Sequence, residues 1–273
     1  MRFLTLGDET FHVEADLAGA STVVFIHALG ADLRIFDECA ALLARQNIGC
    51  FRYDLRGHGL SDLGRPPAHI DDHSADLAAL MDAAGVTKAT ICGVSVGGMV
   101  ALGLWPRRPD LVERLALCCT GAKIGTAEAW NQRIAAICEG GTASVAEAVL
   151  QRWFSPEQYR LGGGKVALCR NMLANGSAPG YAATCVALRD SDLTEVAATV
   201  DVPCLCVAGE FDGSTPPEFV RDLHASLAGS QFTVIPGAGH LPPFQQPEAF
   251  ARELLGFLRE KETAPRGAAG GEG

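Results

Sequence analysis

Continuous apolar runs alternate with amphipathic stretches along the first 120 residues of the chain. Residues 22–26 and 89–92 are unbroken apolar runs, which are typical of strands buried on both faces. Similar runs at 48–53 and 114–119 predict further strands, and residues 1–20 predict a hairpin. Between the strands, apolar side chains recur at helical spacing: Ile35, Phe36, Cys39, Leu42 and Leu43, then Leu77, Leu80, Met81 and Ala84. This alternation predicts an α/β fold with a mainly parallel central sheet flanked by helices.

The alternation stops between residues 123 and 191, where the apolar patterns are helical and no run could join the sheet. An insertion of this length between two strands most simply forms a helical cap over an active site. Strand signals return at 202–208 and 231–235, and a final helix begins after Pro247. We therefore expect a core of residues 1–122 and 192–262, a cap of residues 123–191, and a disordered tail of residues 263–273 rich in glycine and alanine.

A serine lies where the apolar run 89–92 gives way to a helix. The surrounding sequence, Gly93-Val94-Ser95-Val96-Gly97, is the G-x-S-x-G pattern of a nucleophile elbow. Glycines flank the serine because its sharp turn brings a strand and a helix too close together for side chains. The turn exposes the Ser95 hydroxyl beside the first N–H groups of the helix, which can stabilise a developing negative charge.

A serine hydroxyl is a weak nucleophile, so it needs a base and an acid that orients the base. Asp212 and His240 each follow a predicted strand near the C-terminus. Because the carboxyl ends of parallel strands share one edge, we expect both to converge on Ser95. Glu210 is an alternative acid, but Asp212 lies further beyond the strand end and is better placed to reach across. The remaining histidines are interpreted as supporting groups (His27 and His58) or surface residues (His12, His69, His73 and His224).

The turn after residues 22–26 reads His27-Ala28-Leu29-Gly30 and is followed by a predicted helix. This position suits one donor of an oxyanion hole, a pair of N–H groups that hold the oxygen of an attacked carbonyl. We expect the N–H of Val96 to be one donor and that of Leu29 to be the other, with Ala28 as the alternative to Leu29.

On these motifs, together with Asp54-Leu55-Arg56-Gly57-His58-Gly59, the chain is identified as a member of the α/β-hydrolase superfamily over nearly its whole length. Its cap resembles that of the 3-oxoadipate enol-lactonases, which act in the breakdown of aromatic compounds. The resemblance lies in residues 124–134, 152–155, 180–181 and 187–193. It implies a hydrolase that opens the enol-lactone to 3-oxoadipate through an acyl-enzyme on Ser95, without a metal or cofactor.

Such a lactone carries a free carboxylate, which a closed apolar cap can hold only with a cationic partner. Arg133, Arg152 and Arg189 are the candidates in the cap, although each could instead form a surface or interdomain ion pair. Arg133 is the first choice, because Trp130 lies three residues before it on the same helical face. Trp130 and Trp153 either line the acyl pocket or belong to the core of the cap.

Composition narrows the range of partners. The net charge of −10 argues against nucleic acid and anionic membranes, which both need a basic face, but it leaves room for a small anionic substrate. No apolar run reaches the length of a membrane span, and residues 1–8 lack the features of a signal peptide, so we expect a soluble cytoplasmic monomer or small homo-oligomer. Most of the ten cysteines lie in apolar strand or helix patterns, which predicts reduced, buried thiols rather than disulfides. No C-x-x-C pair occurs, which argues against a zinc site.

Two alternatives stay open. The first keeps the hydrolase and changes its substrate to a simple carboxylic ester or another small lactone. The second is a ligand receptor without catalytic activity on a hydrolase fold, which would not need a complete set of Ser95, Asp212 and His240.

Overall fold

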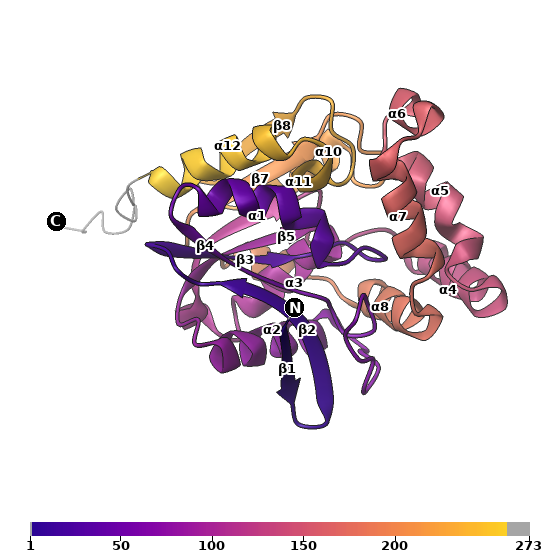
Figure 1. Ribbon diagram of the computed structural model, residues 1–273, viewed down its shortest axis with the longest axis horizontal. Coiled ribbons are helices and arrows are strands. Elements are labelled where there is room, and N and C mark those ends of the chain that lie inside the picture. Colours follow the sequence, from indigo (N-terminus) through magenta and orange to yellow (C-terminus); the bar gives the residue numbers. More distant parts are fainter. Residues whose placement is uncertain (1, 261–273) are drawn as a thin grey trace, which may run out of the picture.

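The computed structural model describes residues 2–260, which form an eight-stranded sheet with helices on both faces (Figure 1). The order of strands is β1-β2-β4-β3-β5-β6-β7-β8. β1 and β2 run antiparallel at one edge, and all pairs from β4 to β8 are parallel. The mainly parallel sheet is therefore confirmed. The strands are β1 (Arg2–Leu6), β2 (Glu9–Asp16), β3 (Ser21–Ile26), β4 (Ile48–Tyr53), β5 (Ala89–Val94), β6 (Val112–Cys118), β7 (Cys204–Gly209) and β8 (Gln231–Ile235).

Strand register brings distant parts of the sequence to one edge of the sheet. Ile26 of β3 pairs with Gly93 of β5, so the turn after β3 and the Ser95 turn emerge side by side. Gly209 of β7 pairs with Ile235 of β8, which places the loops after these strands together at the same edge. This edge, built from the carboxyl ends of the parallel strands, is where the candidate site forms.

The helices of the core lie in two layers. α1 (Asp37–Ala44) packs against α12 (Pro247–Arg259) on one face, and α2 (Ile70–Ala84) packs against α3 (Val96–Leu104) on the other (Figure 1). The helix expected from Ile35 begins as a 3-10 turn, and at its start the Asp32 side chain accepts the N–H of Arg34 at 3.0 Å. The shorter elements are η1 (Leu33–Phe36), η2 (Pro109–Leu111), α9 (Thr194–Ala197), α10 (Pro217–Ser226) and α11 (Pro242–Gln245).

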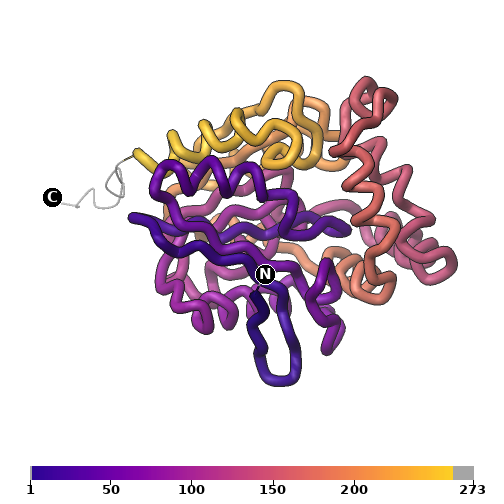
Figure 2. The backbone as a smooth tube through the Cα atoms, viewed as in Figure 1, coloured from indigo at the N-terminus to yellow at the C-terminus, as the bar shows by residue number. Residues whose placement is uncertain are grey.

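Five helices fill the segment between β6 and α9, and residues 123–191, called the cap below, contain no strand. They gather at one end of the molecule, beyond the edge of the sheet (Figures 1 and 2). The helices of the cap are α4 (Ala127–Gly140), α5 (Ala143–Trp153), α6 (Pro156–Leu161), α7 (Gly164–Ala174) and α8 (Ala178–Asp190). The expected tail of residues 263–273 lies outside the described residues.

Two histidines expected at the surface are buried, so that interpretation was wrong for them. His73 on α2 is 0% exposed and its Nε2 lies 3.3 Å from the Thr184 hydroxyl of α8, because the cap covers this face of α2. Burial lowers the pKa of His73 to about 3 and keeps it neutral. His12 is 6% exposed, and its Nδ1 contacts Asp54 at 2.8 Å.

Within residues 2–260, no helix is long and apolar enough to cross a membrane. All ten cysteines are free thiols, and Cys138 is the exposed one. The expectation of reduced, largely buried thiols is therefore in agreement with the structure.

The cap meets the core through a contact between two glycine backbones. A Cβ added to Gly180 of α8 would lie 2.1 Å from the carbonyl oxygen of Gly57 in the loop after β4. We expect Gly180→Ala to lower the free energy of unfolding by roughly 1–3 kcal/mol, the usual cost of overpacking, as measured by denaturant titration. Gly164→Ala is the matched control, because a Cβ on this glycine of α7 meets nothing within 4 Å. Equal stability of the two variants would contradict this prediction.

Candidate active site

The turn that carries Ser95 is strained and held from several sides. Ser95 has φ +58° and ψ −119°, between β5 and α3. A Cβ on Gly93 would lie 2.1 Å from the carbonyl oxygen of Gly97, and a Cβ on Gly97 would lie 2.2 Å from that of Ile26. The Thr120 hydroxyl donates to the Ser95 carbonyl at 2.7 Å. Only glycine fits at both flanking positions, which is the physical basis of the sequence pattern.

The acid that contacts His240 is Asp212. Its Oδ2 lies 2.8 Å from His240 Nδ1, and both side chains are buried. Glu210 instead accepts the N–H of Gly237 at 2.8 Å. Burial raises the pKa of Asp212, but the neighbouring His240 and the N–H groups of Ser214 and Thr215 outweigh it, so the net pKa lies below its usual value. The carboxyl group is therefore ionised at neutral pH, as an acid that orients a histidine must be.

Ser95 and His240 line one cavity of about 170 Å³ beneath the cap. Its wall also contains Leu29 from the turn after β3 and four large side chains of the cap: Trp130, Arg133, Arg152 and Trp153. Arg189 does not line it. Its guanidinium contacts Asp190 at 2.7 Å and Asn131 at 2.9 Å. The carboxylate that pairs with Arg189 is therefore that of Asp190, not that of a substrate as expected from the sequence.

Trp130 and Arg133 form one wall, as their spacing on a helix predicts. The Arg133 guanidinium lies 5.6 Å from the centroid of the Trp130 ring, and its Nη1 donates to the Tyr181 hydroxyl at 3.2 Å. Trp130 donates through Nε1 to the carbonyl of Ile124 at 2.7 Å. Trp130 therefore lines the cavity and also anchors the start of the cap, so the two interpretations of this residue are compatible.

The end of α5 is tied to both catalytic loops. The N–H of Gly213, next to Asp212, donates to the Arg152 carbonyl at 2.9 Å, and the N–H of His240 donates to the Trp153 carbonyl at 2.9 Å. The Trp153 ring also stacks on the His240 ring, with centroids 6.1 Å apart and planes at 25°. The cap thereby fixes the loops that carry the acid and the base.

Of the two expected oxyanion donors, Leu29 lines this cavity and Val96 directly follows the lining residue Ser95. Val96 is the first residue of α3, where a helix leaves its N–H groups without intrahelical acceptors, and Leu29 lines the cavity. His27 supports the turn, as expected from the sequence. Its Nε2 accepts the N–H of Leu55 at 2.9 Å, so Nδ1 carries the proton and donates to the Ala28 carbonyl at 2.8 Å.

Sequence reasoning missed Thr215, which completes the acid's surroundings. Its hydroxyl lies 2.8 Å from Asp212 Oδ2 and 2.8 Å from the carbonyl oxygen of Cys119, and its N–H donates to Asp212 Oδ1 at 3.1 Å. The signal was available, because Asp often accepts N–H groups two and three residues further along the chain.

A possible metal-ligand set also forms here. The ligand atoms of Cys119, Asp212 and His240 lie within 4.8 Å of one another. The set does not fit a metal ion well, because Asp212 and His240 use their facing atoms on each other. In addition, burial raises the pKa of the Cys119 thiol well above its usual value, whereas metal ions bind the thiolate.

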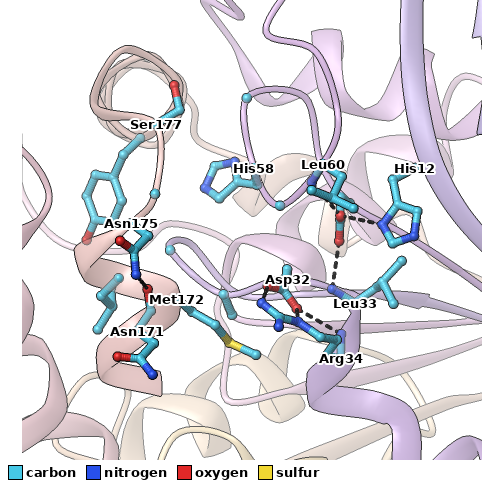
Figure 3. A pocket seen from close by; sticks show the side chains of 18 of the residues that line it. His12, Asp32, Leu33, Arg34, His58, Leu60, Asn171, Met172, Asn175 and Ser177 are labelled. Atoms are coloured by element: carbon cyan, nitrogen blue, oxygen red, sulfur yellow. Dashed lines mark hydrogen bonds and ion pairs between the residues drawn. The ribbon is translucent and has the colours of Figure 1, made fainter. Parts of the chain in front are cut away.

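A second, larger cavity of about 480 Å³ lies between the core loops and the cap helices α7 and α8 (Figure 3). Tyr181 lines both cavities. Charged groups in the larger one are already partnered. The Arg34 Nε donates to Asp32 at 2.9 Å, and Asp54 accepts from His12 at 2.8 Å and from the N–H of Leu33 at 2.8 Å (Figure 3). Burial lowers the pKa of His58, a further lining residue, to about 3. Ser95 and His240 both line the smaller cavity, and neither lines the larger one.

The model of the alpha/beta hydrolase family matches residues 23–253. The chain belongs to this family. Among known proteins, 3-oxoadipate enol-lactonase 2 of Acinetobacter baylyi is 31% identical over 242 residues, or 89% of this chain and 90% of that protein. A pimeloyl-acyl-carrier-protein methyl ester esterase of Neisseria meningitidis is 30% identical over 247 residues, or 86% of this chain and 93% of that protein. These similarities support an ester-hydrolysing enzyme.

Solved structures of similar proteins agree with this fold. The crystal structure of the enol-lactonase from Burkholderia xenovorans has a TM-score of 0.90 and 30% identity, and covers 95% of this chain and 100% of that one. A thermophilic esterase from Thermogutta terrifontis, solved with malate bound, has a TM-score of 0.87 and 28% identity, with 94% and 95% covered.

Thr215 offers a test of the surroundings of Asp212. We expect Thr215→Val to lower kcat about tenfold with little change in KM, because a hydrogen bond to a buried charged group is lost. Thr215→Ser keeps the hydroxyl and should retain most of the activity. The measurement is steady-state hydrolysis of an aryl ester, and unchanged turnover by the valine variant would show that the hydroxyl does not support Asp212.

Proposed function

We propose that this protein is a serine hydrolase that opens the ring of 3-oxoadipate enol-lactone to 3-oxoadipate. The observation that carries the proposal is that Ser95 and His240 line one small cavity bordered by two arginines of the cap, while Asp212 contacts His240 Nδ1 at 2.8 Å. The enol-lactonase relatives named above support the choice of substrate.

The reaction would proceed in two steps. His240 takes the proton of Ser95 through Nε2 while Ser95 attacks the lactone carbonyl, and Asp212 orients the ring through Nδ1. The N–H groups of Leu29 and Val96 hold the oxyanion. The ring oxygen leaves as an enolate. The proton taken up by His240 passes, directly or through water, to the enolate carbon, which gives the ketone and returns His240 to its neutral form. Water activated by His240 then releases the acid from Ser95.

Size and charge both favour a small anionic substrate. The cavity of about 170 Å³ is below the roughly 300–1,000 Å³ typical of sites for drug-sized ligands. Neither Arg133 nor Arg152 pairs with a carboxylate of residues 2–260, so the cavity wall carries positive charge that an anion can neutralise. A simple carboxylic ester of similar size is the second candidate, because the same catalytic residues would hydrolyse it and esterases are among the relatives.

Ser95→Ala tests the nucleophile. We expect the variant to lose roughly 10,000-fold or more in kcat, because removal of the serine from such a set abolishes the acyl-enzyme route. The assay is the loss of ultraviolet absorbance as the enol-lactone opens. An unchanged melting temperature would show that the variant is folded. Retained turnover would contradict the proposal, and efficient hydrolysis of neutral aryl esters with no opening of the enol-lactone would favour the second candidate.

A further inference from the structure

A guanidinium group without an acceptor lies in the wall of the catalytic cavity. Arg152 is the penultimate residue of α5 and lines the cavity beside Ser95 and His240. Its Nε is buried and has no hydrogen-bond partner, and none of its nitrogen atoms pairs with a carboxylate among residues 2–260. Arg152 as a whole is partly exposed, but a buried guanidinium nitrogen without an acceptor is unfavourable, so this place in the cavity wall favours a negatively charged ligand.

Three other arginines of the cap have partners, and a fourth, Arg160 of α6, is exposed to solvent and does not line the cavity. Arg170 contacts Glu147 at 2.6 Å, and Arg189 contacts Asp190 at 2.7 Å. Arg133 donates to the Tyr181 hydroxyl and stacks on Trp130, so its position is fixed by neutral groups. Arg152 differs from these three because no described side chain accepts its hydrogen bonds.

We propose that Arg152 binds the carboxylate of the substrate and sets the preference for anionic over neutral acyl groups. This inference rests on the proposed serine hydrolase activity and names the group that would recognise its substrate. A guanidinium can donate two parallel hydrogen bonds to one carboxylate, which fixes orientation as well as supplying binding energy. Arg133 then serves as part of the cavity wall, rather than as the first choice for binding the carboxylate.

The backbone of Arg152 is fixed relative to the reacting groups. Its carbonyl accepts the N–H of Gly213 at 2.9 Å, and a Cβ on Gly213 would lie 3.2 Å from the Arg152 Cα, so the two segments are in close contact. The next carbonyl, that of Trp153, accepts the N–H of His240. A carboxylate held by Arg152 would therefore be held at a set position relative to the base, which is how a binding group contributes to orientation.

A purely structural role is the competing explanation. Arg152 lies in the last turn of α5, where a positive charge is favourable for the helix whatever the cavity binds. A test must therefore separate binding of an anion from stability and from the chemistry at Ser95.

The experiment uses 4-nitrophenyl acetate as a neutral substrate and adipate, a six-carbon dicarboxylate, as a competitive inhibitor at constant ionic strength. We expect Arg152→Met to raise the inhibition constant of adipate about 10- to 100-fold, because charge-assisted hydrogen bonds are lost. This factor should exceed the factor by which the same substitution lowers kcat/KM for the neutral ester. Arg152→Lys keeps the positive charge but loses the planar guanidinium, so its inhibition constant for adipate should lie between those of the wild-type protein and Arg152→Met. Arg170→Met is the matched control in the cap and should leave both quantities unchanged.

Three results would overturn the inference: no inhibition of the wild-type protein by adipate, an unchanged inhibition constant in Arg152→Met, or an equal effect of Arg170→Met. If Arg152→Met fails to fold, the increase in the inhibition constant for Arg152→Lys decides the question, and its absence overturns the inference. Failure of the proposed function would be seen separately, as hydrolysis of 4-nitrophenyl acetate by Ser95→Ala.

Discussion

The strained backbone at Ser95 is the constraint on which the arrangement of the site depends. A residue with φ +58° and a side chain persists only where its surroundings hold it, at a cost of about 1–3 kcal/mol. Here the Ser95 N–H donates to the Cys118 carbonyl at 2.9 Å, and the Thr120 hydroxyl holds the Ser95 carbonyl. Gly97 lies against the end of β3. Three central strands therefore meet at this turn, and the buried sheet offsets its strain.

The cap does more than close the cavity. The loop of His240 passes between the end of β7 and the end of α5 with no space for side chains. A Cβ on Gly209 would lie 1.8 Å from the Gly239 carbonyl, and a Cβ on Gly239 would lie 2.0 Å from the Trp153 carbonyl. Because the base is packed between core and cap, a displacement of α5 would also displace His240. In the proposed function, substrate recognition and catalysis would thus be linked through Arg152 and Trp153, two consecutive residues of the cap.

Local patterns predicted the sheet, the Ser95 turn and the loops of Asp212 and His240, because each depends on glycines or strand ends that are visible in a short stretch of sequence. The burial of His73 could not be predicted, since it depends on which face of α2 the cap covers. Which arginine of the cap would line the cavity could not be predicted either, since this also depends on how the cap packs on the core. Only Arg189 carried a local signal, the adjacent Asp190, that could have removed it from the candidates.

The net charge of −10 is compatible with the anionic substrate proposed above, because the surface charge and the arginines of the cavity act over different distances. At physiological ionic strength, charges in water are screened beyond roughly 8 Å, so the acidic surface repels an approaching anion only weakly. Inside the cavity, screening is much weaker, and Arg133 and Arg152 have no carboxylates of residues 2–260 as partners. Attraction to these two cations then outweighs the distant negative charge. The proposed preference for an anionic substrate would therefore depend on the cap wall rather than on the protein's overall charge.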